Sequence, residues 1–110
     1  MKRYVVRMTA QAEEHVLKYA EYIKYELMNP QASVRFVNDI RAAVNRLEHM
    51  PKRNPLTDEE PWRSMDIRKM VVRGYIIYYW VEDLEEMVYV IGVVYAKREQ
   101  AEILETMDLK

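Results

Sequence analysis

The chain has 110 residues, a formal net charge of −1 at pH 7 and no cysteine. This length is typical of one domain, so we expect residues 1–110 to form a single domain. Without cysteine, disulfides, thiolate metal sites and cysteine nucleophiles are excluded. The near-neutral charge argues against a large phosphate-binding surface, because dedicated nucleic-acid-binding domains are usually basic. No apolar run approaches the roughly 18 residues of a membrane helix, so we expect a soluble, cytoplasmic protein with no membrane partner.

The first predicted elements are a short strand over residues 4–8 and a long amphipathic helix. We expect Thr9 to cap this helix, because its hydroxyl can accept a hydrogen bond from a free amide of the first turn. From Ala10 onward, apolar side chains recur every three or four residues, which predicts one buried helical face. The members of this stripe are Ala12, Val16, Tyr19, Ala20, Ile23 and Leu27.

A second helix is predicted after Asn29-Pro30. Asparagine tolerates the left-handed conformation at a helix end, and proline suits the first turn of the next helix. The tight connection predicts an antiparallel αα-hairpin, which Met50-Pro51 ends. The apolar stripe of the second helix consists of Phe36, Val37, Ile40, Ala43, Val44 and Leu47.

Three strands are predicted after a proline-rich loop, over residues 67–72, 75–81 and 87–95. Gly74 allows a tight turn between the first two of them. A last helical turn is predicted within residues 97–104. The resulting order, β-α-α-β-β-β, indicates an α+β fold in which the αα-hairpin packs on one face of an antiparallel sheet.

The central strands are apolar on both faces, although the helices can cover only one of them. We therefore expect the second face to be a concave surface that binds another molecule. Alternation along the strand places Tyr75, Ile77 and Tyr79 on one face and Ile76, Tyr78 and Trp80 on the other. A slip of one residue in register would exchange the two sets.

Four segments, in order, resemble toxins of the RelE/ParE superfamily and together span nearly the whole chain. They are the strand–Thr–helix opening of residues 4–12, Asn29-Pro30-Gln31-Ala32 with Phe36 and Ile40, the helix end Leu47-Glu48-His49-Met50-Pro51, and the sheet sequences 67–79 and 93–98. The resemblance implies a type II toxin, neutralised when an antitoxin lays an amphipathic or extended segment across the exposed sheet face.

The register of that superfamily implies that Tyr75, Ile77 and Tyr79 face the helices. The candidates for binding the antitoxin or the target are then Ile76, Tyr78, Trp80 and Tyr95. His15 and His49 are isolated, and the chain has no phosphate-loop, nucleophile-elbow or zinc motif, so we expect no cofactor and no metal.

Members of the superfamily have one of two activities. RelE-like toxins cleave mRNA on the ribosome, whereas ParE-like toxins poison DNA gyrase and need no catalytic groups. Arg98 stands where the family has an arginine after the last strand, and Lys97 precedes it as in cleaving members. However, Ile76 replaces the sheet arginine of the cleaving members, and Leu104 replaces the catalytic tyrosine that some of them carry.

Losing those groups would cost a nuclease several kcal/mol of transition-state stabilisation. The residues therefore favour a ParE-like toxin that acts on gyrase or another protein. A ribosome-dependent mRNA endonuclease stays open as an alternative, with Arg68, Arg73, Tyr78 or Tyr95 as substitute groups beside Arg98 and Lys97. A third alternative is a non-toxic member of the same fold that acts only as an interaction module.

Overall fold

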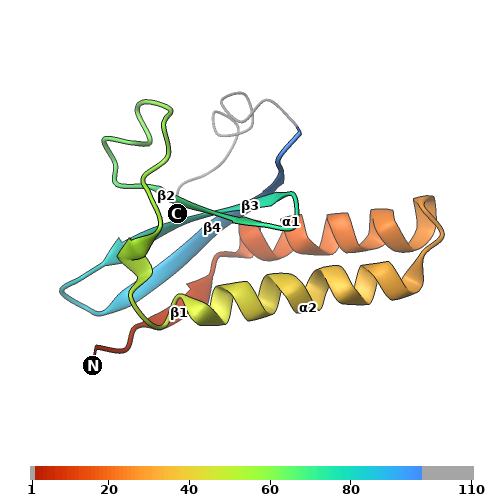
Figure 1. Ribbon diagram of the computed structural model, residues 1–110, viewed down its shortest axis with the longest axis horizontal. Helices are drawn as coiled ribbons and strands as arrows, with labels where there is room; N and C mark the ends of the chain where they lie inside the picture. Colours follow the sequence, from red (N-terminus) through yellow and green to blue (C-terminus); the bar gives the residue numbers. More distant parts are fainter. Residues whose placement is uncertain (1, 98–110) are drawn as a thin grey trace.

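The computed structural model describes residues 2–97, in which an αα-hairpin lies against one face of a four-stranded sheet (Figure 1). The predicted order β-α-α-β-β-β and the α+β class are confirmed. The elements are β1 (Val5–Met8), α1 (Ala10–Glu21), the π-helix η1 (Tyr22–Glu26), α2 (Pro30–Arg46), the 3₁₀ turn η2 (Pro51–Arg53), β2 (Arg68–Val72), β3 (Tyr75–Glu82) and β4 (Met87–Tyr95). The helical turn predicted within residues 97–104 lies outside the described residues, except for residue 97.

The strand order in the sheet is β1-β4-β3-β2. Strands β2, β3 and β4 pair antiparallel, as predicted, but β1 pairs parallel to β4, with Val5 opposite Met87. The sheet is therefore mixed rather than wholly antiparallel. Parallel neighbours need a long connection, and here both helices and two strands separate β1 from β4 in the chain.

The helix ends follow from local side-chain chemistry. The Thr9 hydroxyl accepts a hydrogen bond from the Ala12 amide at 3.2 Å, which confirms the predicted cap. Asn29 also acts as an N-cap, for α2, by accepting from the Ala32 amide at 3.1 Å. The left-handed residue between the helices is Met28, with φ 51°, whereas Asn29 has φ −132°, so the expectation of a left-handed Asn29 is wrong.

The first helix does not stay α-helical as far as the turn. It widens after Glu21 into η1, where the Leu27 amide donates to the Tyr22 carbonyl at 3.1 Å, five residues back. The Ser33 hydroxyl of α2 donates to the Ala20 carbonyl of α1 at 2.7 Å and so joins the two helices. Such π-turns insert extra backbone into a helix and often occur at functional sites.

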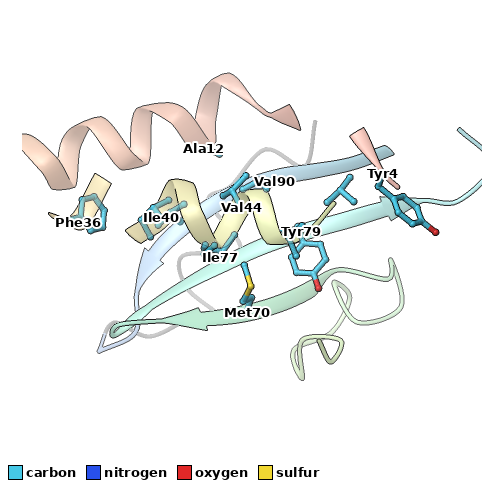
Figure 2. Packing of buried hydrophobic residues seen from close by; sticks show 13 residues of the cluster. Tyr4, Ala12, Phe36, Ile40, Val44, Met70, Ile77, Tyr79 and Val90 are labelled. Atoms are coloured by element: carbon cyan, nitrogen blue, oxygen red, sulfur yellow. The ribbon is translucent and has the colours of Figure 1, made fainter. Parts of the chain in front are cut away.

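The main core lies between the αα-hairpin and the sheet. Ile77, Tyr79 and Val90 of the strands face Ile40 and Val44 of α2 (Figure 2). Tyr75, Ile77 and Tyr79 all belong to this helix-facing side, as the register of the superfamily implied. Burying a side chain of this size contributes roughly 1.5–3 kcal/mol, so this layer dominates the stability of the fold.

A second, smaller cluster occupies the other face of the sheet. There the loop before β2 folds back, and its Trp62 and Ile67 pack on Ile76 and Tyr78 of β3 and on Ile91 of β4. The backbone anchors this loop, because the Thr57 amide donates to the Ile67 carbonyl at 2.8 Å and the Lys69 amide to the Pro55 carbonyl at 3.0 Å. Much of the face predicted to be open is thus covered by the chain itself. Within residues 2–97, no helix combines the length and apolar character needed to cross a membrane.

Candidate functional site

A β-bulge in β4 decides which side chains reach the helical face. Tyr78 pairs with Gly92 whereas Tyr79 pairs with Val90, so Ile91 is an extra residue in β4. An extra residue resets the alternation of the strand. As a result, both Val90 and Val93 pack in the helix-facing core, three positions apart.

The same bulge brings Tyr95 to the helical side. Its ring lies 5.3 Å from that of Tyr75, whose ring lies 5.2 Å from that of Tyr19 of α1. Tyr95, one of the candidates for binding the antitoxin or the target, therefore lies on the helix-facing side of the sheet. The three tyrosine rings, with Phe36 at 4.6 Å from Tyr75, form an aromatic wall at the end of the sheet.

Side chains of α1 bond to the edge of β4 beyond the residues that pair with β1. Pairing with β1 ends where Met8 meets Val90. Beyond that point three side chains at four-residue spacing bond to the β4 backbone. The Gln11 side-chain amide donates to the Ile91 carbonyl at 2.7 Å, the His15 Nδ1 accepts from the Val93 amide at 3.1 Å, and the Tyr19 hydroxyl accepts from the Tyr95 amide at 3.0 Å. This edge of β4 therefore has its backbone groups bonded to α1 rather than to a strand.

The helices extend beyond the end of the sheet (Figure 1). A groove opens there between the helical hairpin and the last residues of β4. Its volume is about 770 Å³. Tyr22 and Leu27, on its helical side, are 54% and 57% exposed because no strand lies beneath them. The groove is lined by His15, Lys18, Tyr19, Tyr22, Ile23, Leu27, Tyr75, Val93, Val94 and Tyr95.

Among the lining residues that the structure describes, Lys18 is the one that is charged at neutral pH. Its ammonium pairs with Glu14 at 3.1 Å, and both side chains are well exposed. His15 is half-buried, and burial lowers its pKa below the ordinary value of 6.5. The histidine is therefore neutral at pH 7, consistent with its role as a hydrogen-bond acceptor. Within residues 2–97, the groove combines apolar and aromatic walls with one cation.

Of the candidate cations of a cleavage site, Arg68 and Arg73 each bond to groups of the chain itself. The Arg68 guanidinium donates to the Asn54 and Lys52 carbonyls at 2.7 and 3.2 Å, and it lies on the helical side of β2, opposite Tyr79. Arg73 follows β2 and pairs with Asp39 of α2 at 3.1 Å. Lys97 is the last described residue and is exposed, while Arg98 and Leu104 lie outside the described residues.

Among the residues predicted to bind a partner on the open face, Trp80 alone is exposed. Its side chain stacks on Tyr89 with ring centroids 5.8 Å apart, and it remains 36% exposed. Ile76 and Tyr78 are 2% and 0% exposed in the second cluster, so the expectation that they form an accessible surface is wrong. Burial also raises the pKa of Tyr78, which makes its hydroxyl a poor proton donor for a nuclease. No three histidine or carboxylate side chains within residues 2–97 gather as metal ligands would.

Reasoning from the sequence missed the groove, although one signal was available. The apolar stripe of the first helix runs from Ala12 to Leu27, whereas the preceding strand was predicted to have only five residues. A strand advances about 3.3 Å per residue and a helix 1.5 Å, so the stripe is longer than that strand can cover. That comparison indicates only that the first strand cannot by itself cover the whole apolar face of the helix.

Comparisons with known proteins agree with this geometry. Residues 6–100 match the family model described as the ParE toxin of the type II toxin–antitoxin system parDE. No curated protein matches the sequence. Among solved structures, the chromosomal ParDE toxin–antitoxin system from P. aeruginosa aligns with TM-score 0.71 and 13% identity, covering 88% of this chain and 100% of that one.

Two further structures align over most of their length. The toxin–antitoxin complex RelBE2 from Mycobacterium tuberculosis gives TM-score 0.63 at 19% identity, covering 88% of this chain and 97% of that one. A mutant of the E. coli toxin RelE in the free state gives TM-score 0.58 at 19% identity, covering 94% of this chain and 92% of that one. At these identities the alignments show a shared fold.

Proposed function

The chain belongs to the ParE toxin family of type II toxin–antitoxin systems, and we propose that it arrests bacterial growth by binding a protein target, DNA gyrase in the first instance, without cleaving RNA. A cognate antitoxin binds the free toxin and prevents this. Two of the structural neighbours are toxin–antitoxin systems, which supports an antitoxin as the partner of this chain.

One observation carries the choice of a non-cleaving mechanism. A nuclease must place cations where charge develops on the phosphate and an acid or base beside the leaving oxygen. Here the guanidinium of Arg68 bonds to loop carbonyls and that of Arg73 to Asp39, both away from the open face. Tyr78, the remaining substitute on that face, is fully buried. The described residues therefore offer binding surfaces rather than an assembled set of catalytic groups.

Binding of a target and binding of an antitoxin both need exposed apolar surface. Such surface is present at the distal end of the αα-hairpin, where Tyr22, Tyr25, Leu27 and Met28 are 54–84% exposed. Contiguous apolar exposure of this kind marks interaction sites in many proteins. It gives the toxin an adhesive region that does not depend on the covered face of the sheet.

The test is controlled expression of the toxin in bacteria together with assays on purified components. We expect growth arrest with induction of the DNA-damage response, and inhibition of supercoiling when purified toxin is added to DNA gyrase. Primer extension on cellular mRNA should show no new ends. Co-expression of the protein encoded by the adjoining reading frame should restore growth.

Each contrary result has a defined meaning. Codon-positioned mRNA cuts would replace the proposal with a ribosome-dependent endonuclease. Growth arrest without DNA damage and without gyrase inhibition would exclude gyrase as the target. Harmless expression at confirmed levels of folded protein, in cells lacking any antitoxin, would leave only an interaction module.

A further inference from the structure

We propose that an apolar patch on the open face of the sheet, beside the β3–β4 turn, is the surface through which the toxin binds its protein target. This hairpin-end patch consists of Val5, Trp80, Met87 and Tyr89. The matching surface of the target has an apolar centre and a border of basic side chains. The inference rests on the proposed function, because it names the toxin surface and the kind of target surface that meet when DNA gyrase is inhibited.

The register of three neighbouring strands builds this patch. Val5 of β1 lies opposite Met87 of β4, and Tyr89 of β4 lies opposite Trp80 of β3. The residues next to them along the strands pack in the helix-facing core, namely Val6, Tyr79, Val81, Val88 and Val90. Because side chains alternate along a regular strand, the four patch residues share the other face of the sheet.

The loop that folds over this face leaves the patch exposed. Trp62 and Ile67 pack in the second cluster, whereas the patch lies toward the β3–β4 turn, at the end of the molecule opposite the tip of the αα-hairpin (Figure 1). Val5 remains 54% exposed and Trp80 36%, and the Trp80 ring stacks on that of Tyr89. Aromatic side chains in such positions often anchor protein–protein interfaces. Among the described residues, the patch is therefore apolar surface that the chain itself does not bury.

The turn beside the patch is held in one conformation by distant parts of the chain. The Asp83 carboxylate accepts a hydrogen bond from the Tyr4 hydroxyl at 2.9 Å and forms an ion pair with Lys52. The Glu86 carbonyl accepts from the Val5 amide at 2.9 Å, and this bond joins the turn to β1. Glu86 also has a left-handed φ of 53°, which is uncommon for a residue other than glycine. A surface fixed in this way before binding loses little conformational entropy when a partner arrives.

The charges that border the patch indicate a basic partner. Glu82 ends β3, and Glu85 and Glu86 are exposed in the turn that follows, while the neighbouring cation is Arg7 of β1, opposite Tyr89. These carboxylates repel phosphate, so the stacked aromatic pair is a poor platform for nucleic acid. They attract a protein surface of opposite charge. Proteins that hold DNA carry clusters of basic side chains, so DNA gyrase offers surface of this kind.

The experiment measures how purified full-length toxin inhibits DNA supercoiling by purified gyrase. The patch variants are Val5→Arg and Glu85→Lys, both at exposed positions where the fold should tolerate them. Val71→Arg is the matched control for the first, because Val71 is 67% exposed on β2 and lies opposite Ile76, away from the patch. Glu13→Lys, at an exposed position of α1, is the control for the second. Circular dichroism confirms that each variant is folded.

We expect each patch variant to raise the toxin concentration for half-inhibition at least about tenfold, and each control to change it less than about threefold, since a few central residues dominate an interface. Added salt should weaken the wild type more than Glu85→Lys, because salt screens the attraction that this variant lacks.

Wild-type-like inhibition by both folded patch variants, or an equal loss in Val71→Arg, overturns the patch while gyrase remains the target. Binding of single-stranded DNA or RNA by the wild type that is lost in Trp80→Ala would make the patch a nucleic-acid surface and also overturn the inference. If the wild type does not inhibit gyrase at all, the proposed target itself fails, and the assignment of the patch fails with it.

Discussion

His15 of α1 accepts a hydrogen bond from the backbone amide of Val93 in β4, with 3.1 Å between Nδ1 and N. This bond is the middle one of three that join side chains of α1 to the backbone of β4, beyond the part of β4 that pairs with β1. It requires the neutral imidazole, because a protonated ring has a hydrogen on both nitrogens and cannot accept. Burial lowers the pKa of His15, which keeps this form at pH 7.

The first prediction concerns pH. The pKa of His15 is lower in the folded state than the 6.5 of the unfolded chain, so the unfolded state binds the proton more readily. The resulting stability is fully present above pH 6.5 and is lost as the pH falls through the folded-state pKa. Urea unfolding at pH 8, 7, 6 and 5 should show a steeper loss for the wild type than for His15→Gln. Glutamine can accept the same bond but does not titrate; equal slopes for the two proteins would contradict the assignment.

The second prediction concerns the buried hydroxyl of Tyr79. It donates to the Pro51 carbonyl and accepts from the Asn54 side-chain amide at 3.0 Å, and so fastens η2 to the sheet. Tyr79→Phe leaves those groups without this partner and should lower the free energy of unfolding by about 1–3 kcal/mol. The control is Tyr25→Phe, at a residue 65% exposed, for which we expect no change. Chemical denaturation of both variants provides the measurement.

The third prediction concerns the start of α2. The side chain of Asn29 satisfies the Ala32 amide, which otherwise has no partner within the helix. Asn29→Ala should cost about 1 kcal/mol, and Asn29→Asp or Asn29→Ser should cost much less, since both retain a capping oxygen. Thermal melts of the three variants at pH 7 would test this ranking. An alanine variant as stable as the serine variant would show that the cap contributes nothing.

The fourth prediction separates a structural from a catalytic role for Arg68. Because its guanidinium binds the Asn54 and Lys52 carbonyls, Arg68→Ala should destabilise the fold by roughly 1–3 kcal/mol. Lys69→Ala is the neighbouring control, since Lys69 pairs only at 3.5 Å with the exposed Asp58, and it should cost less than about 1 kcal/mol. Growth arrest measured at equal levels of folded protein should be unchanged in both variants. Loss of toxicity in a stable Arg68→Ala protein would restore the catalytic interpretation.

Many elements of the fold follow from short-range patterns. The Thr9 hydroxyl caps α1, and the fixed φ of proline suits the start of α2. Gly74 forms the turn between β2 and β3 because glycine adopts its φ of 85° without strain. The alternation of β3 correctly separated Ile77, which faces the helices, from Ile76, because side chains alternate strictly along a regular strand.

The candidate site was less predictable. Period-two alternation holds only while a strand is regular, and the extra residue Ile91 moves Tyr95 onto the helical face. The neighbouring sequence does not distinguish an apolar residue that stays exposed from one that is covered by a loop distant in the chain. For this reason Tyr78 was expected to be accessible but is buried with Trp62, while Tyr22 was overlooked.

By itself, the sequence determined the kinds and order of the elements, the buried face of each helix and the resemblance to one toxin superfamily, because these depend on periodicity and on residues near one another in the chain. Only the tertiary structure decided the parallel pairing of β1, the covering of the second sheet face and the groove beyond the sheet. Those features depend on the relative lengths of packed layers and on contacts between residues such as His15 and Val93, which lie 78 positions apart.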